Sequence, residues 1–275
     1  IMPSLVGSEM CIRDSNRMVQ QLSPIKRGGI GKLETRLINE QSLMIYFKNE
    51  ISENTYEKVN KTVQYIQNQK HKDIIDIVPS YRAILITFDN MNIDGTELIE
   101  NLELSQISDT KLNNQNQRKI ITIPVVYGGD FGPDLDEVAS YNNLSNDEVI
   151  DIHTQQAYLI YMLGFMPGFP YLGGLDKRIH TPRRSEPRVK IDAGSVGIAN
   201  NQTGLYPLDS PGGWQIIGRT PLKVFDLNRD PMTIYEAGDY IQFKAITQDE
   251  YDQIVSDINN EHFDIDKWVT YENEY

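Results

Sequence analysis

The sequence predicts an α+β protein made of two units, on three observations. From about residue 34 to 117 the apolar residues recur in the order strand, helix, strand, strand, helix, strand. From 118 to 248 short β-branched runs alternate with turn residues, which is typical of a compact barrel or sandwich. The stretch 164–221 holds 10 of the 19 Gly and 7 of the 13 Pro, so the sequence dictates its turns.

The charge balance excludes several kinds of partner. The chain has 26 Lys and Arg against 39 Asp and Glu, and the net charge of −13 argues against a general affinity for nucleic acid or anionic membranes. The stretch 164–221 has seven basic and four acidic residues, so charge favours a small anion there. No apolar run reaches the roughly 18 residues of a membrane span. The single cysteine, Cys11, excludes an internal disulfide and fits a reducing, cytoplasmic compartment.

Residues 1–33 are predicted to be non-native or disordered. Residues 1–15 lack the basic start and apolar core of a targeting segment and resemble a translated adapter sequence, so Cys11 is given no role. The run 28–32 resembles a phosphate loop, but Lys26 and Leu33 stand where that loop needs Gly and Ser or Thr. We therefore expect a mobile terminal segment.

The first unit, 34–117, has the element order of a ferredoxin-like domain. Asp94 and Glu97 are spaced as a capping box at the start of its second helix. Pro79 and Ser80 mark the turn between its second and third strands. We expect strands over 43–47, 74–78 and 82–88, and helices over 56–66 and from 94 to 102. The strand over 119–127, just past the boundary, is counted as the last element of this order.

The second unit, 118–248, begins with two predicted short helices. One starts at Pro133, and the other is capped by Ser145 with Glu148. A buried strand over 157–165 then leads into the Gly- and Pro-rich stretch, and an alternating strand is expected over 239–245.

Residues 249–275 are predicted to form a helix to about Asn260 and then an acidic tail. From Thr247 onwards the chain has nine acids and one Lys. We expect the tail to be solvated unless Phe263 and Trp268 dock on the protein.

Seven motifs carry a family resemblance: 123–135, 164–176 (GFMPGFPYLGGLD), 181–184 (TPRR), 187–188, 193–199, 202–207 and 210–215 (SPGGWQ). In this order they closely resemble the KipI-like family, which includes the B-type subunit of bacterial 5-oxoprolinase and was long labelled allophanate hydrolase subunit 1. The resemblance covers roughly residues 34–250. The sequence departs from the family pattern at His180, where small residues are common, and in its long acidic tail.

The resemblance implies a ferredoxin-like domain followed by a cyclophilin-like β-barrel. It implies a non-autonomous subunit that works with two further proteins, one KipA-like (the C-type subunit) and one LamB/YcsF-like (the A-type subunit). The implied reaction is the ATP-dependent opening of the 5-oxoproline lactam to L-glutamate. ATP, with Mg²⁺, is expected in the complex and is not assigned to one subunit.

The expected chemistry needs cations or backbone N–H groups around a phosphoryl group. Arginine forks suit phosphate or carboxylate, and paired glycines can present bare amides. The predicted catalytic residues are Arg184, Arg188 and His180, and the predicted substrate- or phosphate-binding residues are Arg183, Arg219, Gly173, Gly174, Gly212, Gly213, Tyr171, Gln202 and Trp214.

Each of these predictions has a structural alternative. The arginines could tie down loops through carbonyl groups and Asp176 or Asp209, while the glycines only form turns. His153 is either a proton shuttle or a structural histidine. The acids of 130–137 fit a helix start better than a Mg²⁺ site, and no metal site is predicted.

Two other functions stay open. A KipI-like protein can act as a regulator that inhibits a sensor histidine kinase, and the barrel could bind peptides or isomerise prolyl bonds by analogy of fold alone. A serine nucleophile is not supported, because neither Ser195 nor Ser210 lies in a hydrolase elbow.

Overall fold

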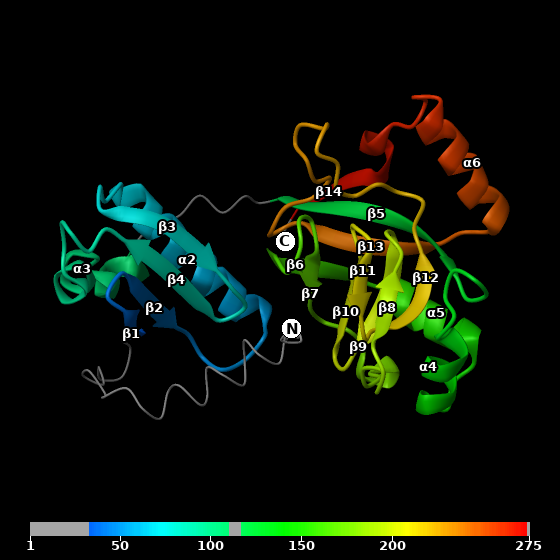
Figure 1. Cartoon of the computed structure of the whole chain (residues 1–275), viewed down its shortest axis with the longest axis horizontal. Helices are drawn as coiled ribbons and strands as arrows, with labels where there is room; N and C mark the ends of the chain where they lie inside the picture. The colour runs from blue at the N-terminus through cyan, green and yellow to red at the C-terminus, as the bar shows by residue number, and fades with distance from the viewer. Residues whose placement is uncertain (1–32, 110–116, 274–275) are drawn as a thin grey trace.

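The computed structural model of the chain describes residues 33–109 and 117–273, which form two units side by side (Figure 1). The predictions made for residues 1–32, including Cys11 and the run 28–32, lie outside the described residues. Within the described ranges, no helix is long and apolar enough to cross a membrane.

The first unit is a four-stranded antiparallel sheet with helices packed on it. Its elements are β1 (Glu34–Asn39), β2 (Ser42–Tyr46), α2 (Glu53–Gln69), β3 (Ile74–Pro79), β4 (Ala83–Phe88), α3 (Gly95–Asn101) and the 3-10 helix η1 (Leu104–Asp109). The strand order is β1-β2-β4-β3. The predicted strands near 43–47, 74–78 and 82–88 and both predicted helices are confirmed.

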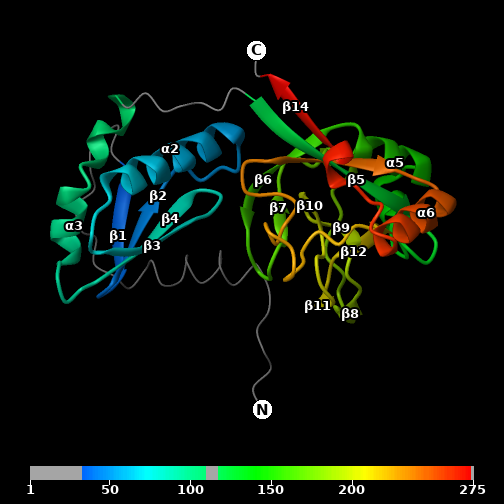
Figure 2. The same ribbon diagram turned by 90° about the horizontal axis from the view of Figure 1, so that it is seen from above.

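Helix α2 covers one face of this sheet (Figure 2). The helix begins where the Ser52 side chain accepts a hydrogen bond from the Thr55 N–H, and it ends at Lys70 in the left-handed conformation. Its buried Val59 and Ile66 share one core cluster with apolar residues of β2 and β4. The apolar residues spaced by about 3.6 along the helix thus pack against those spaced by two along the strands, and together they form one core.

The second unit is built on an eight-stranded sheet. Its elements are β5 (Gln117–Tyr127), α4 (Leu135–Asn142), α5 (Asn146–Thr154), β6 (Ala157–Leu163), β7 (Pro170–Leu172), the 3-10 helix η2 (Lys177–Ile179), β8 (Arg188–Ile191), β9 (Ser195–Ala199), β10 (Gln202–Leu205), β11 (Ser210–Gly212), β12 (Gln215–Arg219), β13 (Tyr240–Ala245), α6 (Gln248–Asn259), the 3-10 helix η3 (Ile265–Trp268) and β14 (Val269–Asn273).

Strand β5 is the centre of this sheet, whose order is β10-β9-β12-β5-β13-β6-β7. One edge of β5 pairs in parallel with β13, while β12 and β14 pair with the two ends of its other edge. The terminal strands of the order, β7 and β10, contact each other, so the sheet is nearly closed into a barrel. Strands β8 and β11 form a separate two-stranded ribbon.

The expectation that the strand at 119–127 completes the first unit is wrong. That segment is β5, and its partners lie in the second sheet, the most extensive being β13, more than 100 residues further along the chain. The fourth place in the first sheet is taken by β1, which the sequence did not predict. The side chains of β1 are half-buried or exposed without a clean alternation, so the strand lacks the usual sequence signal.

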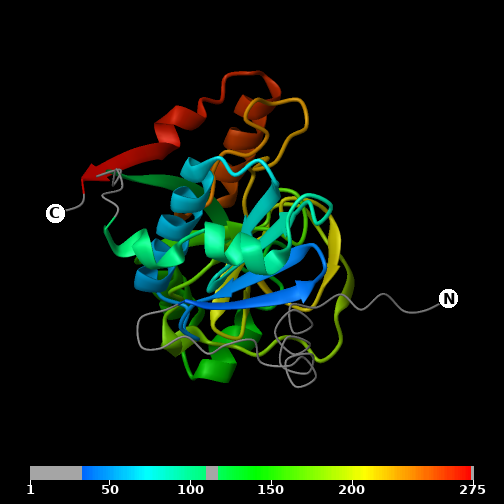
Figure 3. The same ribbon diagram turned by 90° about the vertical axis from the view of Figure 1, so that its left-hand side faces the viewer.

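The acidic tail docks on the barrel. The predicted helix is α6, which starts with a capping box between Thr247 and Glu250 and ends at Asn259. Phe263 and Trp268 then stack at 6.4 Å and pack against the barrel core, so the condition for docking is met. Strand β14 follows and pairs with β5 at the outer side of the barrel (Figure 3).

Candidate functional site

Asp134 is the centre of a buried ion cluster in the barrel unit. It stands just before α4 and is only 3% exposed, yet its side chain does not cap that helix. Its carboxylate accepts hydrogen bonds from Arg184 Nη1 at 2.8 Å and from Arg188 Nη1 and Nη2 at 2.8 and 2.7 Å. The backbone N–H of Ile216 donates a fourth bond, at 2.6 Å. Four donors make a buried carboxylate tolerable, because each replaces a lost bond to water.

The cluster carries an excess of positive charge. Two guanidinium groups share the one buried carboxylate of Asp134, and this hydrogen bonding raises the pKa of Arg188. Glu137 approaches Arg184 to 3.6 Å, but its side chain is more than half exposed and solvent screens the pair. Both arginine side chains are partly exposed, Arg184 by 30% and Arg188 by 26%. The cluster therefore offers fixed cationic N–H groups to an anion.

Arg183 joins this cluster through Trp214. The Arg183 guanidinium lies 5.8 Å from the centre of the Trp214 ring, and the neighbouring Arg184 N–H donates to the Gly213 carbonyl at 2.8 Å. These contacts tie the loop that carries Arg183 and Arg184, just before β8, to the loop before β12. The structure thus brings together Arg183, Arg184, Arg188, Gly213 and Trp214 of the predicted site, which we call the arginine cluster.

The other predicted glycines are placed by packing and by turns. A Cβ on Gly212 would lie 2.6 Å from the Tyr206 hydroxyl, and one on Gly173 would lie 2.4 Å from the Tyr161 ring. Gly174 has a φ of +86°, in the region that favours glycine, and its carbonyl accepts a hydrogen bond from the Gln156 side chain. These contacts explain the glycines without a ligand, and a binding role for them stays a prediction.

Tyr171 and Gln202 lie where the first unit packs on the barrel. Gln202 Nε2 donates to the Tyr81 hydroxyl at 2.5 Å, and the Tyr81 and Tyr171 rings meet edge to face at 6.0 Å. These two predicted residues therefore contact the first unit directly.

Arg219 and His180 have partners of their own. Arg219 Nη2 donates to Asp192 at 2.8 Å, and its guanidinium lies 6.0 Å from the centre of the Phe131 ring. His180 Nε2 lies 3.0 Å from the Leu175 carbonyl oxygen. A carbonyl oxygen only accepts, so the His180 Nε2–H donates this bond.

His153 is a buried structural histidine. Its Nε2 is 2.7 Å from the Thr203 hydroxyl and its Nδ1 is 2.7 Å from the Tyr127 hydroxyl. Because Thr203 donates to the Gly197 carbonyl at 3.1 Å, it accepts from His153 Nε2–H, and Tyr127 donates to Nδ1. Burial lowers the pKa of His153 to about 3, so the ring is neutral at physiological pH.

Sequence reasoning missed the role of Asp134. It treated this residue as a helix-start acid or a weak Mg²⁺ candidate, whereas the structure uses it to hold arginines that lie 50 or more positions away. The opposite charges of the segments 130–137 and 183–188 are the one signal that could have suggested the pairing. Among the described residues, no group of three or more His, Cys, Asp or Glu could hold a metal ion.

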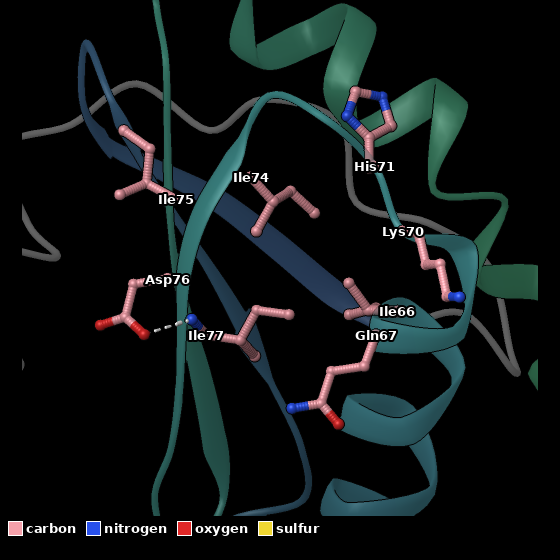
Figure 4. A pocket seen from close by; sticks show the side chains of 8 residues that line it. All are labelled: Ile66, Gln67, Lys70, His71, Ile74, Ile75, Asp76 and Ile77. Atoms are coloured by element: carbon pink, nitrogen blue, oxygen red, sulfur yellow. Dashed lines mark hydrogen bonds between the residues drawn. The ribbon is translucent and has the colours of Figure 1, made fainter.

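Two shallow hollows lie far from this cluster, in the first unit. The larger, of about 290 Å³, is bounded by the end of α2 and by strand β3 (Figure 4). The Asp76 carboxylate beside it accepts a hydrogen bond from the Ile77 N–H at 2.9 Å. A charged side chain at this edge strand disfavours pairing with another chain. Neither hollow contains a residue of the predicted site.

A known protein family has this combination of units. A small sheet unit is followed by a nearly closed barrel with short helices, and residues 33–235 match the family described as carboxyltransferase domain, subdomain C and D. The chain belongs to this family.

Relatives make the family resemblance more specific and confirm it. The chain is 42% identical over 223 residues to the B-type subunit of 5-oxoprolinase from Bacillus subtilis (strain 168), a match that covers 78% of this chain and 93% of that protein. It is 37% identical over 207 residues to the same subunit from Escherichia coli O157:H7, covering 75% and 93% of the two chains.

Solved structures share the fold. The crystal structure of TTHA0988 is 29% identical with a TM-score of 0.65, over 75% of this chain and 40% of that one. The urea amidolyase of K. lactis gives a TM-score of 0.69 at 20% identity, over 87% of this chain and 16% of that one. The second likeness shows the fold alone, as one part of a much longer enzyme.

Proposed function

We propose that this chain is the B-type subunit of an ATP-dependent 5-oxoprolinase, which opens the 5-oxoproline lactam to L-glutamate while ATP is hydrolysed. The identity of 37–42% to proteins that are named as this subunit, over most of their length, favours this reaction over a regulatory role. The structural observation that carries the proposal is the arginine cluster around Asp134.

The cluster has the properties that this reaction needs. A lactam is a poor electrophile, and phosphorylation of its oxygen creates a leaving group with charge spread over several oxygens. Asp134 fixes the inner N–H groups of Arg184 and Arg188, so their outer N–H groups keep one orientation. Donors held in place before the substrate arrives stabilise developing charge without reorganising.

His180 is the proposed proton-transfer residue, and it would act through Nδ1. Its Nε2 is already used on the Leu175 carbonyl. That bond would fix the ring and its tautomer and leave Nδ1 to accept a proton from an attacking water.

ATP is a substrate of the proposed reaction, and its Mg²⁺ complex is expected in the assembly without being assigned to one subunit. The arginine cluster of this chain offers N–H donors that fit an oxyanion. The proposed partners are a KipA-like protein and a LamB/YcsF-like protein, the C-type and A-type subunits of the complex, in the cytoplasm.

The finer fold assignment belongs to the same proposal. We interpret residues 34–117 as a ferredoxin-like domain in which β1 replaces the usual last strand, and 118–248 as a cyclophilin-like barrel extended by 249–275. Supporting this, β2, α2, β3, β4 and α3 keep the ferredoxin-like order.

Reconstitution tests the proposal. This chain, the KipA-like protein and the LamB/YcsF-like protein are mixed, and ADP and glutamate release from 5-oxoproline are followed. Turnover should need all three, and Arg188→Ala should abolish it while the complex still elutes as one species. Arg178→Ala is the matched control, because Arg178 is exposed and pairs with Asp176 outside the cluster. A stable three-protein complex without turnover would contradict the proposal.

A further inference from the structure

The turn between β3 and β4 reaches from the first unit to the barrel (Figures 1 and 2). Ser80 closes this turn, with both its N–H and its hydroxyl donating to the Ala83 carbonyl, at 2.8 and 3.1 Å. The next residue, Tyr81, carries its ring into the space between the two units. A short, hydrogen-bonded turn of this kind holds its tip residue in a fixed place.

Tyr81 contacts three elements of the barrel. Its ring lies 5.2 Å from Tyr161 of β6 and 6.0 Å from Tyr171 of β7, and its hydroxyl accepts a hydrogen bond from Gln202 of β10. Strands β7 and β10 are the two terminal strands of the nearly closed sheet. One side chain of the first unit therefore spans the place where the barrel closes.

Aromatic contacts continue from this point to the arginine cluster. The Tyr171 ring lies 5.3 Å from Phe169, which is buried and lies 5.7 Å from Trp214. Trp214, also buried, lies under the Arg183 guanidinium at 5.8 Å. Buried rings in edge-to-face contact have little room to move separately, so a shift at one end is transmitted to the next.

We propose that Tyr81 is a positioning residue for the arginine cluster: through Tyr171 and Phe169 it seats Trp214 and so fixes Arg183. The first unit then supplies part of the support for a site on the barrel. The relevance of Tyr81 to turnover rests on the proposed function, whereas the effect of Tyr81 on Trp214 does not.

The fluorescence of Trp214 tests the packing claim on the isolated full-length chain. The chain has two tryptophans, so Trp268→Phe leaves Trp214 as the only one. In this background Tyr81→Ala should raise the acrylamide quenching constant about twofold or more, because loosened rings admit the quencher. Tyr81→Phe keeps the ring and should stay close to the parent value. Tyr141→Ala, on the exposed end of α4, is the control and should have no effect.

Kinetics of the reconstituted complex test the positioning role. Tyr81→Ala should lower kcat/KM for 5-oxoproline by roughly 10- to 100-fold, mainly through KM, and Tyr81→Phe should restore most of it. Assembly, followed by gel filtration, should be unchanged.

The outcomes separate the two proposals. Unchanged quenching in Tyr81→Ala overturns the inference, and so does increased quenching with unchanged kinetics, since Tyr81 would then be merely structural. If the unmodified complex shows no turnover, the proposed function fails, and the quenching result alone decides whether Tyr81 seats Trp214. If Tyr81→Ala does not fold, Tyr81→Leu replaces it, because it removes the ring but keeps an apolar side chain, and it should raise quenching by a smaller factor.

Discussion

Asp134 and His153 are both buried in the barrel unit, but charge surrounds the first and neutral groups surround the second. Asp134 receives two guanidinium groups and a backbone N–H, while His153 lies between two hydroxyl groups and stacks on the Phe243 ring. The carboxylate is matched by the positive charge of its partners. The imidazole stays neutral because burial penalises its charged form.

The difference indicates where ligands can act. The arginines around Asp134 are partly exposed, so they can share their outer N–H groups with a ligand. His153 is fully buried, and both of its ring nitrogens are used. One buried polar group therefore supports a site and the other supports the core.

The largest expected effect comes from removing the carboxylate of Asp134. Asp134→Ala leaves two guanidinium groups without their buried partner and should lower the free energy of unfolding by about 3–5 kcal/mol. Urea denaturation measures this. Asp136→Ala is the matched control, because that carboxylate accepts from Asn146 at the exposed surface, and it should change stability far less. Equal losses of unfolding free energy in the two variants would mean that the buried ion cluster stabilises the fold no more than a surface carboxylate does.

A pH series sharpens the contrast at His153. Its folded pKa of about 3 lies below the unfolded value, so the unfolded state binds more protons between these two pKa values. The contribution of the neutral ring to stability is complete above about pH 6.5 and is lost as pH falls towards 3. Between pH 6.5 and 5 the wild type should lose about 1.6 kcal/mol more in total than His153→Gln. Urea denaturation at each pH gives the unfolding free energy of both proteins. The same pH dependence in wild type and His153→Gln over this range would contradict the neutral, buried His153.

Local elements were predictable, and their long-range partners were not. The apolar spacing predicted helix α2 to within a few residues at each end. Strand β5 was recognised as a strand but placed in the wrong sheet, because its pairing with β13 depends on a segment far along the chain. Sequence patterns report burial and period, and they do not report which strand lies alongside.

The same limit applies to the candidate site. The arginines were identified because the Gly- and Pro-rich stretch is locally basic. Asp134 could not be assigned to them, since a carboxylate after Pro133 has the ordinary sequence signature of a helix start. Only the fold brings the segment before α4 against the arginine loop.

A smaller effect is expected where the two units meet. Gln202→Ala removes one hydrogen bond to Tyr81 in a half-buried place and should cost about 1 kcal/mol of unfolding free energy. Urea denaturation at neutral pH checks this. A loss as large as that of Asp134→Ala would show that the contact between the units, rather than the ion cluster, dominates the stability of the barrel.

The smallest effect should be at Val189, whose side chain is 92% exposed beside Arg188 on strand β8. Val189→Ser should change the unfolding free energy by less than about 0.5 kcal/mol, because little apolar area is buried there. Thermal unfolding monitored by circular dichroism suffices to measure it. A clear loss would mean that the ribbon of β8 and β11 is sensitive to any change near the cluster.

The most direct test of the account is kcat/KM for 5-oxoproline in the Arg184→Ala variant of the reconstituted complex. Asp134 would still hold Arg188 and the Ile216 N–H, so the cluster should survive the change. If the arginines stabilise the reacting oxygens, kcat/KM should fall by about 10²–10³-fold with assembly intact. Full activity in an assembled Arg184→Ala complex would contradict the placement of the reaction at this cluster.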